Sequence, residues 1–234
     1  MGIDSLGDVA GNIEDDTAYR AFVWSPLGQT TLLKPTYPYL MPFGPRGCGA
    51  SAMSSHGYVV GNCQPDLDNY IAEWAPGATD TLRTTCCNGI DGNALAVTDN
   101  QYLTGYVRNF NPPQAFLWRP GQPTYDIIGY YGGMPEVSIG LAVNSSGWVA
   151  GWGLIGPTLV DTVAVVWIGS NGGQTGLSHY GQATGIDDKF NARPPGSIYT
   201  GGESAAVAIN SVHQILGSAI DKNAVKHTVI WTSF

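Results

Sequence analysis

Five segments of the chain share one pattern of apolar and polar positions. Each begins with a short apolar stretch, passes through a polar turn and a second aliphatic stretch, and ends on a glycine. Small polar residues cap tight turns and glycine adopts the positive φ that such turns need, so each segment predicts two antiparallel strands joined as a hairpin. The five segments are 2–11, 52–61, 96–105, 142–151 and 208–217.

A third strand is predicted after each hairpin, and each of these strands ends on a tryptophan. Apolar residues alternate along them, so that Phe22 and Trp24, for example, share one face. A Pro-Gly turn and a short fourth strand follow in several repeats, as at 76–82. Because the tryptophans recur so regularly, we expect them in the hydrophobic core rather than at a ligand site. They are Trp24, Trp74, Trp118, Trp167 and Trp231.

Four short strands in units of roughly 45 residues are typical of a β-propeller blade. We therefore predict an all-β, five-bladed β-propeller that forms a single domain over 1–234. Small residues in the innermost strands suit a narrow centre and favour five blades over seven. The predicted repeats cover approximately 1–44, 45–88, 89–134, 135–177 and 202–234, with an insertion at 178–201. This insertion is either a functional loop or a cover over an exposed blade edge.

The units resemble the HAF family of extracellular repeats. The first half of the family pattern is matched by Ala142, Asn144, Gly147, Val149 and Gly151, and the second half by Ala115, Phe116 and Trp118. The histidine of the motif is replaced by Arg20 and Gln114 in two units and is present as His227 in the last. The resemblance implies export and a repetitive β fold, and it implies no catalytic residues.

Composition and charge narrow the classes of function. The formal net charge is −8, which argues against non-specific nucleic-acid binding through lysine and arginine. No apolar run reaches the roughly 18 residues of a membrane span, and 43% hydrophobic residues is too high for a disordered chain. The expected partner is a carbohydrate or an extracellular protein, with a homo-oligomer as a further option.

The cysteines favour a secreted protein with one or two disulfides, and Met1 is interpreted as replacing a removed leader. Cys48 precedes the turn of the second hairpin by six residues and Cys63 follows it by six, so antiparallel pairing places them opposite each other. We predict this disulfide, with Cys86 or Cys87 as the competing partner and free buried thiols as the alternative.

Aromatic residues supply one candidate ligand site. The position after the hairpin turn holds Tyr58, Tyr102 and Trp148 in three repeats and Asp8 and Gln214 in the other two. Flat aromatic side chains stack on sugar rings, which makes these residues candidates for carbohydrate binding. Packing between blades is the favoured alternative. Tyr106 and Trp152 lie four residues further along the same strand face and join the candidate set.

Acidic residues supply a second candidate site. Asp4, Asp187, Asp188 and Glu203 could approach the central axis, where a glycosidase would need two carboxylates on either side of a bond. Nothing in the sequence sets a distance between them, so no catalytic residue is assigned. No cofactor or metal is predicted. Other acids follow the second strands, where a solvated rim is favoured over a Ca²⁺ site.

These observations predict a secreted, non-catalytic binding module, lectin-like or adhesive. The basis of this prediction is that the repeats form a complete framework and the sequence contains no catalytic constellation. One alternative is a polysaccharide-active enzyme, a glycoside hydrolase or lyase, with acids at the central opening. The other is a structural subunit of an extracellular assembly, in which exposed strands pair between chains.

Overall fold

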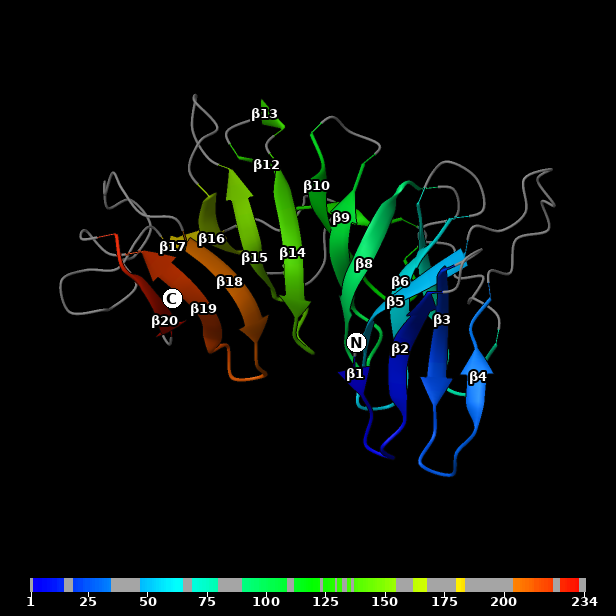
Figure 1. Ribbon diagram of the computed structural model, residues 1–234. Coiled ribbons are helices and arrows are strands. Elements are labelled where there is room, and N and C mark those ends of the chain that lie inside the picture. The colour runs from blue at the N-terminus through cyan, green and yellow to red at the C-terminus, as the bar shows by residue number, and fades with distance from the viewer. Residues whose placement is uncertain are drawn as a thin grey trace. The chain divides into compact units, whose positions relative to one another are not determined.

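The computed structural model consists of β-strands and connecting turns, and its described residues contain no helix (Figure 1). The chain forms two compact units, residues 1–109 with 118–125, and residues 110–117 with 126–234. The structure describes residues 2–14, 19–34, 47–64, 69–79, 90–108, 112–122, 124–128, 130–131, 134–135, 137–154, 162–167, 180–183, 204–220 and 224–231.

The first two repeats form one continuous sheet, because their strands join edge to edge. The link is a parallel pairing in which Tyr19 lies opposite Gly47 and Arg20 opposite Cys48. The strand order is β1-β2-β3-β5-β6-β7, and β4 pairs with β3 off this path. The strands are β1 (Gly2–Ile3), β2 (Val9–Glu14), β3 (Tyr19–Trp24), β4 (Thr30–Leu32), β5 (Gly47–Met53), β6 (Val59–Cys63) and β7 (Tyr70–Trp74).

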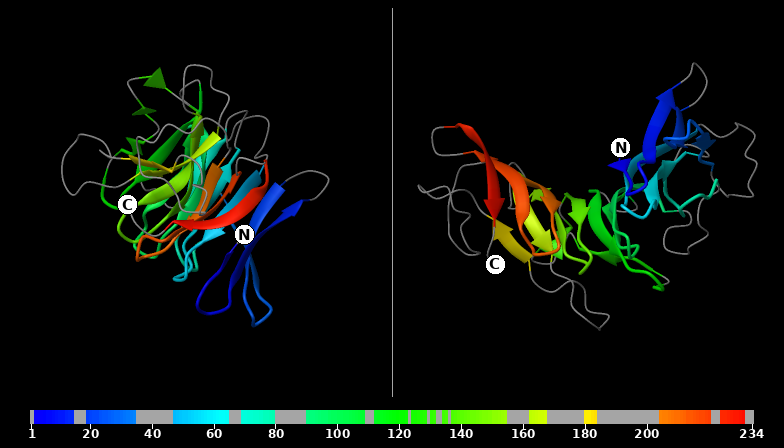
Figure 2. Two further views of the ribbon diagram at one scale, coloured as in Figure 1. Left: turned by 90° about the vertical axis from the view of Figure 1, so that its left-hand side faces the viewer. Right: turned by 90° about the horizontal axis from the view of Figure 1, so that it is seen from below.

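The remaining repeats form separate antiparallel sheets, whose strands twist as they run side by side (Figure 2). The third holds β8 (Gly92–Val97), β9 (Leu103–Val107), β10 (Gln114–Trp118) and β11 (Asp126–Ile127), followed by the pair β12 (Tyr130–Tyr131) and β13 (Met134–Pro135). The fourth holds β14 (Ser138–Val143), β15 (Val149–Leu154), β16 (Thr162–Trp167) and β17 (Tyr180–Ala183), and the fifth β18 (Ser204–Ile209), β19 (Ile215–Ile220) and β20 (Lys226–Trp231).

The five predicted hairpins and the five third strands are confirmed, and every third strand ends on its predicted tryptophan. Of the predicted insertion at 178–201, the structure describes β17, which is the fourth strand of its sheet. The rest of the insertion lies outside the described residues. The all-β class is therefore established, while a closed five-bladed ring and the single domain stay predictions.

The hairpin turns share one backbone geometry. In the fourth repeat, Gly147 N donates to Asn144 O over 2.9 Å, and Asn144 N donates to Trp148 O over 3.0 Å. The Asn144 side chain completes the turn, because its Oδ1 accepts from Ser146 N and Trp148 N. The third loop residue needs positive φ, which explains glycine there in three repeats. This position holds Gly7, Gly57, Gln101, Gly147 and His213.

Sheets stack in the same way at both ends of the chain. In the first unit, the core cluster joins Ala10, Ala21 and Leu33 of the first repeat to Val59 and Trp74 of the second. In the second unit, Ala150, Ala164 and Val166 pack likewise on Ile215 and Trp231. Within each pair, the tryptophan-bearing face of one repeat is therefore covered by the opposite face of the repeat before it.

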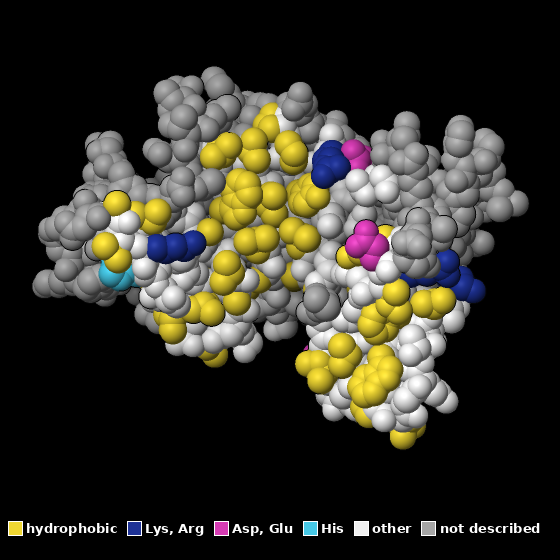
Figure 3. Space-filling model, in the orientation of Figure 1, with side chains coloured by type: hydrophobic (Ala, Val, Ile, Leu, Met, Phe, Trp, Pro, Cys, Tyr) yellow, Lys and Arg dark blue, Asp and Glu magenta, His cyan; other side chains and the backbone are white. Residues whose placement is uncertain are grey.

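One of the five tryptophans departs from the prediction that all lie in the core. Trp74, Trp118, Trp167 and Trp231 are buried, whereas Trp24 is 40% exposed. The reason is the stacking order, because no described residue of the first unit covers the face that carries Trp24. Apolar side chains are accordingly visible on the surface of the sheet that contains β1 to β4 (Figure 3).

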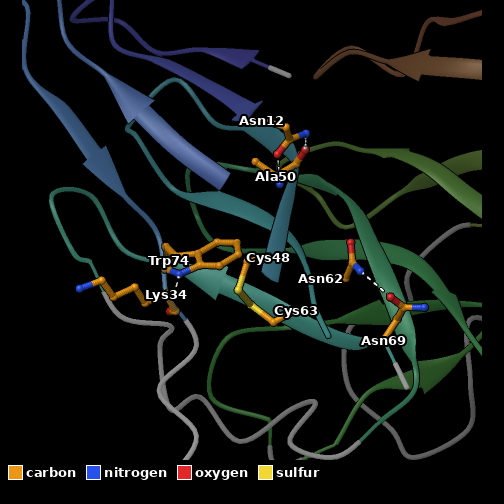
Figure 4. The surroundings of a disulfide bond; sticks show 8 residues. All are labelled: Asn12, Lys34, Cys48, Ala50, Asn62, Cys63, Asn69 and Trp74. Carbon is orange, nitrogen blue, oxygen red and sulfur yellow. Dashed lines mark hydrogen bonds between the residues drawn. A yellow bond between two sulfur atoms is a disulfide. The ribbon is translucent and has the colours of Figure 1, made fainter. Parts of the chain in front are cut away.

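The disulfide between Cys48 and Cys63 is confirmed, and it joins direct cross-strand partners of β5 and β6. Both residues are buried in the same cluster as Trp74, whose indole Nε1 donates to Lys34 O over 3.0 Å (Figure 4). The competing partners Cys86 and Cys87 lie outside the described residues. The disulfide therefore links the two strands of the second repeat's hairpin within the core that packs on the first repeat.

Candidate functional site

A groove of about 430 Å³ lies between the first and second repeats, entirely within the first unit. Both repeats contribute the tips of their hairpins and the ends of their third strands. Apolar side chains, among them Val23, Leu33 and Met53, line part of it. Its polar lining consists of Asp4, Asp8, Ser25, Gln29, Thr31 and His56. An apolar surface with a few polar groups is the usual composition of a small-ligand site, and the volume is in the usual range.

Comparison of the repeats explains why the groove is open. In the fourth repeat, the position after the turn holds Trp148, and its indole stacks on the imidazole of His213 in the next turn, with ring centroids 3.8 Å apart. The corresponding positions in the first pair are Asp8 and Gly57, and both line the groove. Two rings fill the space between turns in the last pair, whereas a short side chain and a glycine leave it empty in the first.

Asp4 is held by the turn that it caps. Its Oδ1 accepts hydrogen bonds from Leu6 N and Asp8 N, each over 2.9 Å. This turn is also tied to the second one, because Ser5 N donates to Ser55 O over 2.8 Å. The wall of the groove that carries Asp4 and Asp8 is therefore fixed by backbone hydrogen bonds before any ligand arrives.

The opposite rim of the groove carries His56, which is anchored from the third repeat. His56 N donates to Asp99 Oδ1 over 2.8 Å, and its Nδ1 lies 3.6 Å from the same oxygen. Ser55 Oγ donates to Asp99 Oδ2 over 2.5 Å. This hydroxyl bond is the main cause that lowers the pKa of the Asp99 carboxyl from its ordinary value of 3.8. The rim is thus polar and fixed in place.

Ser25 supplies a hydroxyl that the described residues leave without a hydrogen-bond partner. Its backbone N donates to Gln29 O over 2.8 Å, which closes the turn after β3. Its Oγ is buried and has no hydrogen-bond partner among the described residues. A buried hydroxyl without a partner costs free energy, so a polar ligand atom at this wall of the groove would relieve that cost.

The aromatic residues predicted from the sequence lie in the second, third and fourth repeats, and none of them lines the groove. Trp148 stacks on His213, as described above, and Tyr106 has the Arg108 guanidinium 5.4 Å from its ring centroid. Trp152 lies opposite Ile139 and Ala164 in its sheet. All five aromatic candidates are half-buried: Tyr58, Tyr102, Tyr106, Trp148 and Trp152.

Of the predicted acidic candidates, the structure describes only Asp4, which it places at the groove. Asp187, Asp188 and Glu203 lie outside the described residues. Within the described ranges, no group of three or more histidine, cysteine or acidic side chains could hold a metal ion. Sequence reasoning missed the groove residues Asp8, Ser25 and His56 as a set. The available signal was Asp8 itself, at a position that is aromatic in three of the five repeats.

No protein-family model and no curated protein matches this chain. Among the residues that the structure describes, no helix is both long and apolar enough to cross a bilayer.

Proposed function

We propose that this protein is a non-catalytic carbohydrate-binding module and that the groove of the first unit is its binding site. The observation that carries the proposal is the groove itself, with apolar side chains beside Asp8, Ser25 and Gln29. A pyranose presents an apolar face and directional hydroxyls, and this lining offers a counterpart to both. The Trp148–His213 pair supports a ring-sized occupant, because two rings fill the equivalent space there.

A binding role suits the carboxylates of the groove better than hydrolysis does. A glycosidase needs two carboxyl groups free to act on opposite sides of one bond. Asp4 Oδ1 already accepts two backbone hydrogen bonds and serves the turn. Asp8 is the remaining carboxylate of the lining and is suited to accepting hydrogen bonds from a bound ligand.

We also propose an extracellular setting and a five-bladed β-propeller of HAF type for the whole chain. The Cys48–Cys63 disulfide supports an oxidising compartment. Five hairpins of one design and the same stacking order in both units support repeated blades. The ligand would then be a glycan outside the cell, with a protein surface as the other extracellular partner.

The test of the binding proposal is to fill the groove. Asp8→Trp places at this position the residue that the fourth repeat carries, and we expect it to abolish binding to glycans identified on an array. Gln214→Trp is the matched control, because it adds the same side chain at the equivalent, exposed position of the last repeat. Equal binding by both variants, or no glycan bound by the unmodified protein at millimolar concentration, would contradict the proposal.

A further inference from the structure

The groove is lined by acidic side chains and by no basic lysine or arginine side chain. Its lining contains two carboxylates, Asp4 and Asp8, and no lysine or arginine. Asp4 is committed to its turn, but no hydrogen bond or ion pair within the described residues involves the Asp8 carboxylate. An ionised carboxylate in a concave site attracts cations, and a charge-assisted hydrogen bond is about twice as strong as a neutral one.

The neighbours of Asp8 favour a ring rather than a simple ion. Asp4, Asp8 and His56 are the acidic and histidine side chains of the lining, and the described residues form no group of three or more histidine, cysteine or acidic side chains that could hold a metal ion. The equivalent space in the last pair holds an indole and an imidazole. The unpartnered Ser25 Oγ and the amide of Gln29 add hydrogen-bonding groups suited to hydroxyls.

We infer that the groove selects a sugar bearing a free ammonium group, such as a β-1,4-linked glucosamine oligomer. The inference rests on the proposed carbohydrate-binding function and names its ligand class. The pyranose ring lies in the space left open between the turns, its apolar face toward Met53 and Val23. The ammonium group donates to the Asp8 carboxylate, and ring hydroxyls pair with Ser25 and Gln29.

The experiment compares a glucosamine trimer with its N-acetylated counterpart by titration calorimetry at pH 6, on the full chain. N-acetylation removes the charge and keeps the sugar backbone. We expect the glucosamine trimer to bind at least ten-fold more tightly, and the difference to shrink as salt is raised. Asp8→Asn keeps the shape of the side chain and should remove the preference. Glu14→Gln is the control, because it removes one exposed negative charge of the same sheet away from the groove lining.

The outcomes separate this inference from the proposed function. If both trimers bind equally and Asp8→Trp blocks both, the groove binds carbohydrate and the ammonium selection is wrong. If the preference survives Asp8→Asn or is lost equally in Glu14→Gln, it arises from the net charge of the protein, and the assignment to Asp8 is overturned. If neither trimer binds, the inference fails, and the array result with Asp8→Trp decides the proposed function separately.

Discussion

At the scale of single residues, the glycine that ends the hairpin pattern is required by a close approach between strands in four of the five repeats, at Gly61, Gly105, Gly151 and Gly217. Opposite it, the first strand of the hairpin carries a β-bulge, for example between Gly140 and Ala142 in β14. The bulge turns a backbone carbonyl toward the glycine. A Cβ at Gly105 or Gly151 would lie 1.9 or 2.0 Å from the carbonyl oxygen of Asn93 or Ile139. No side chain fits there without moving the backbone.

This geometry predicts a large difference between two glycines of the same strand. Gly151→Ala forces a shift of the bulged strand and should destabilise the protein by about 1–3 kcal/mol. Gly153→Ala is the matched control, since its Cβ would meet Val137 O at an ordinary 3.4 Å. Urea unfolding of both variants measures the difference. Equal midpoints for Gly151→Ala and Gly153→Ala would show that the close approach does not exist in solution.

At the scale of elements, the disulfide joins β5 and β6 within the core that stacks the second repeat on the first. The bond closes a loop with a sequence separation of 15 residues, and this raises the free energy of the unfolded chain by about 3 kcal/mol. We therefore expect reduction, or the Cys48→Ala, Cys63→Ala double variant, to lower amide-exchange protection in β5 to β7. Protection in β14 and β15 is the internal control. Uniform loss of protection across all sheets would contradict a local role for the bond.

Adjacent turns are coupled through Asp99, which accepts from Ser55 Oγ and His56 N. Its pKa is lowered by these bonds, so the contribution to stability is present above the unfolded-state pKa and is lost as the pH falls through the folded-state value. In a carboxyl titration followed by NMR, the Asp99 midpoint should lie below 3.8 and rise in Ser55→Ala. An unchanged midpoint in that variant would contradict the assigned cause.

The strands and turns of this fold could be predicted from the sequence because residues close together in the chain determine them. The turn residues at 144–147, the tryptophan that ends each third strand and the symmetric placement of Cys48 and Cys63 all act within one repeat. The groove could not be predicted in the same way, because it depends on which side chains of two repeats face each other. The exposure of Trp24 escaped prediction for the same reason, since it depends on which sheet faces are covered.

At the scale of the whole molecule, the proposed five-bladed ring makes a prediction that small-angle X-ray scattering can test. A compact chain of 234 residues has a radius of gyration of about 17 Å. We expect a monomer near this value, constant over a dilution series that excludes self-association. In a closed ring each blade would bury its tryptophan-bearing face on a neighbour, whereas an open row of the same sheets would be longer and would leave the Trp24 face in water. A monomer with a clearly larger radius would therefore exclude the closed ring, while the stacking of repeats within each unit and the groove between the first two would be unaffected.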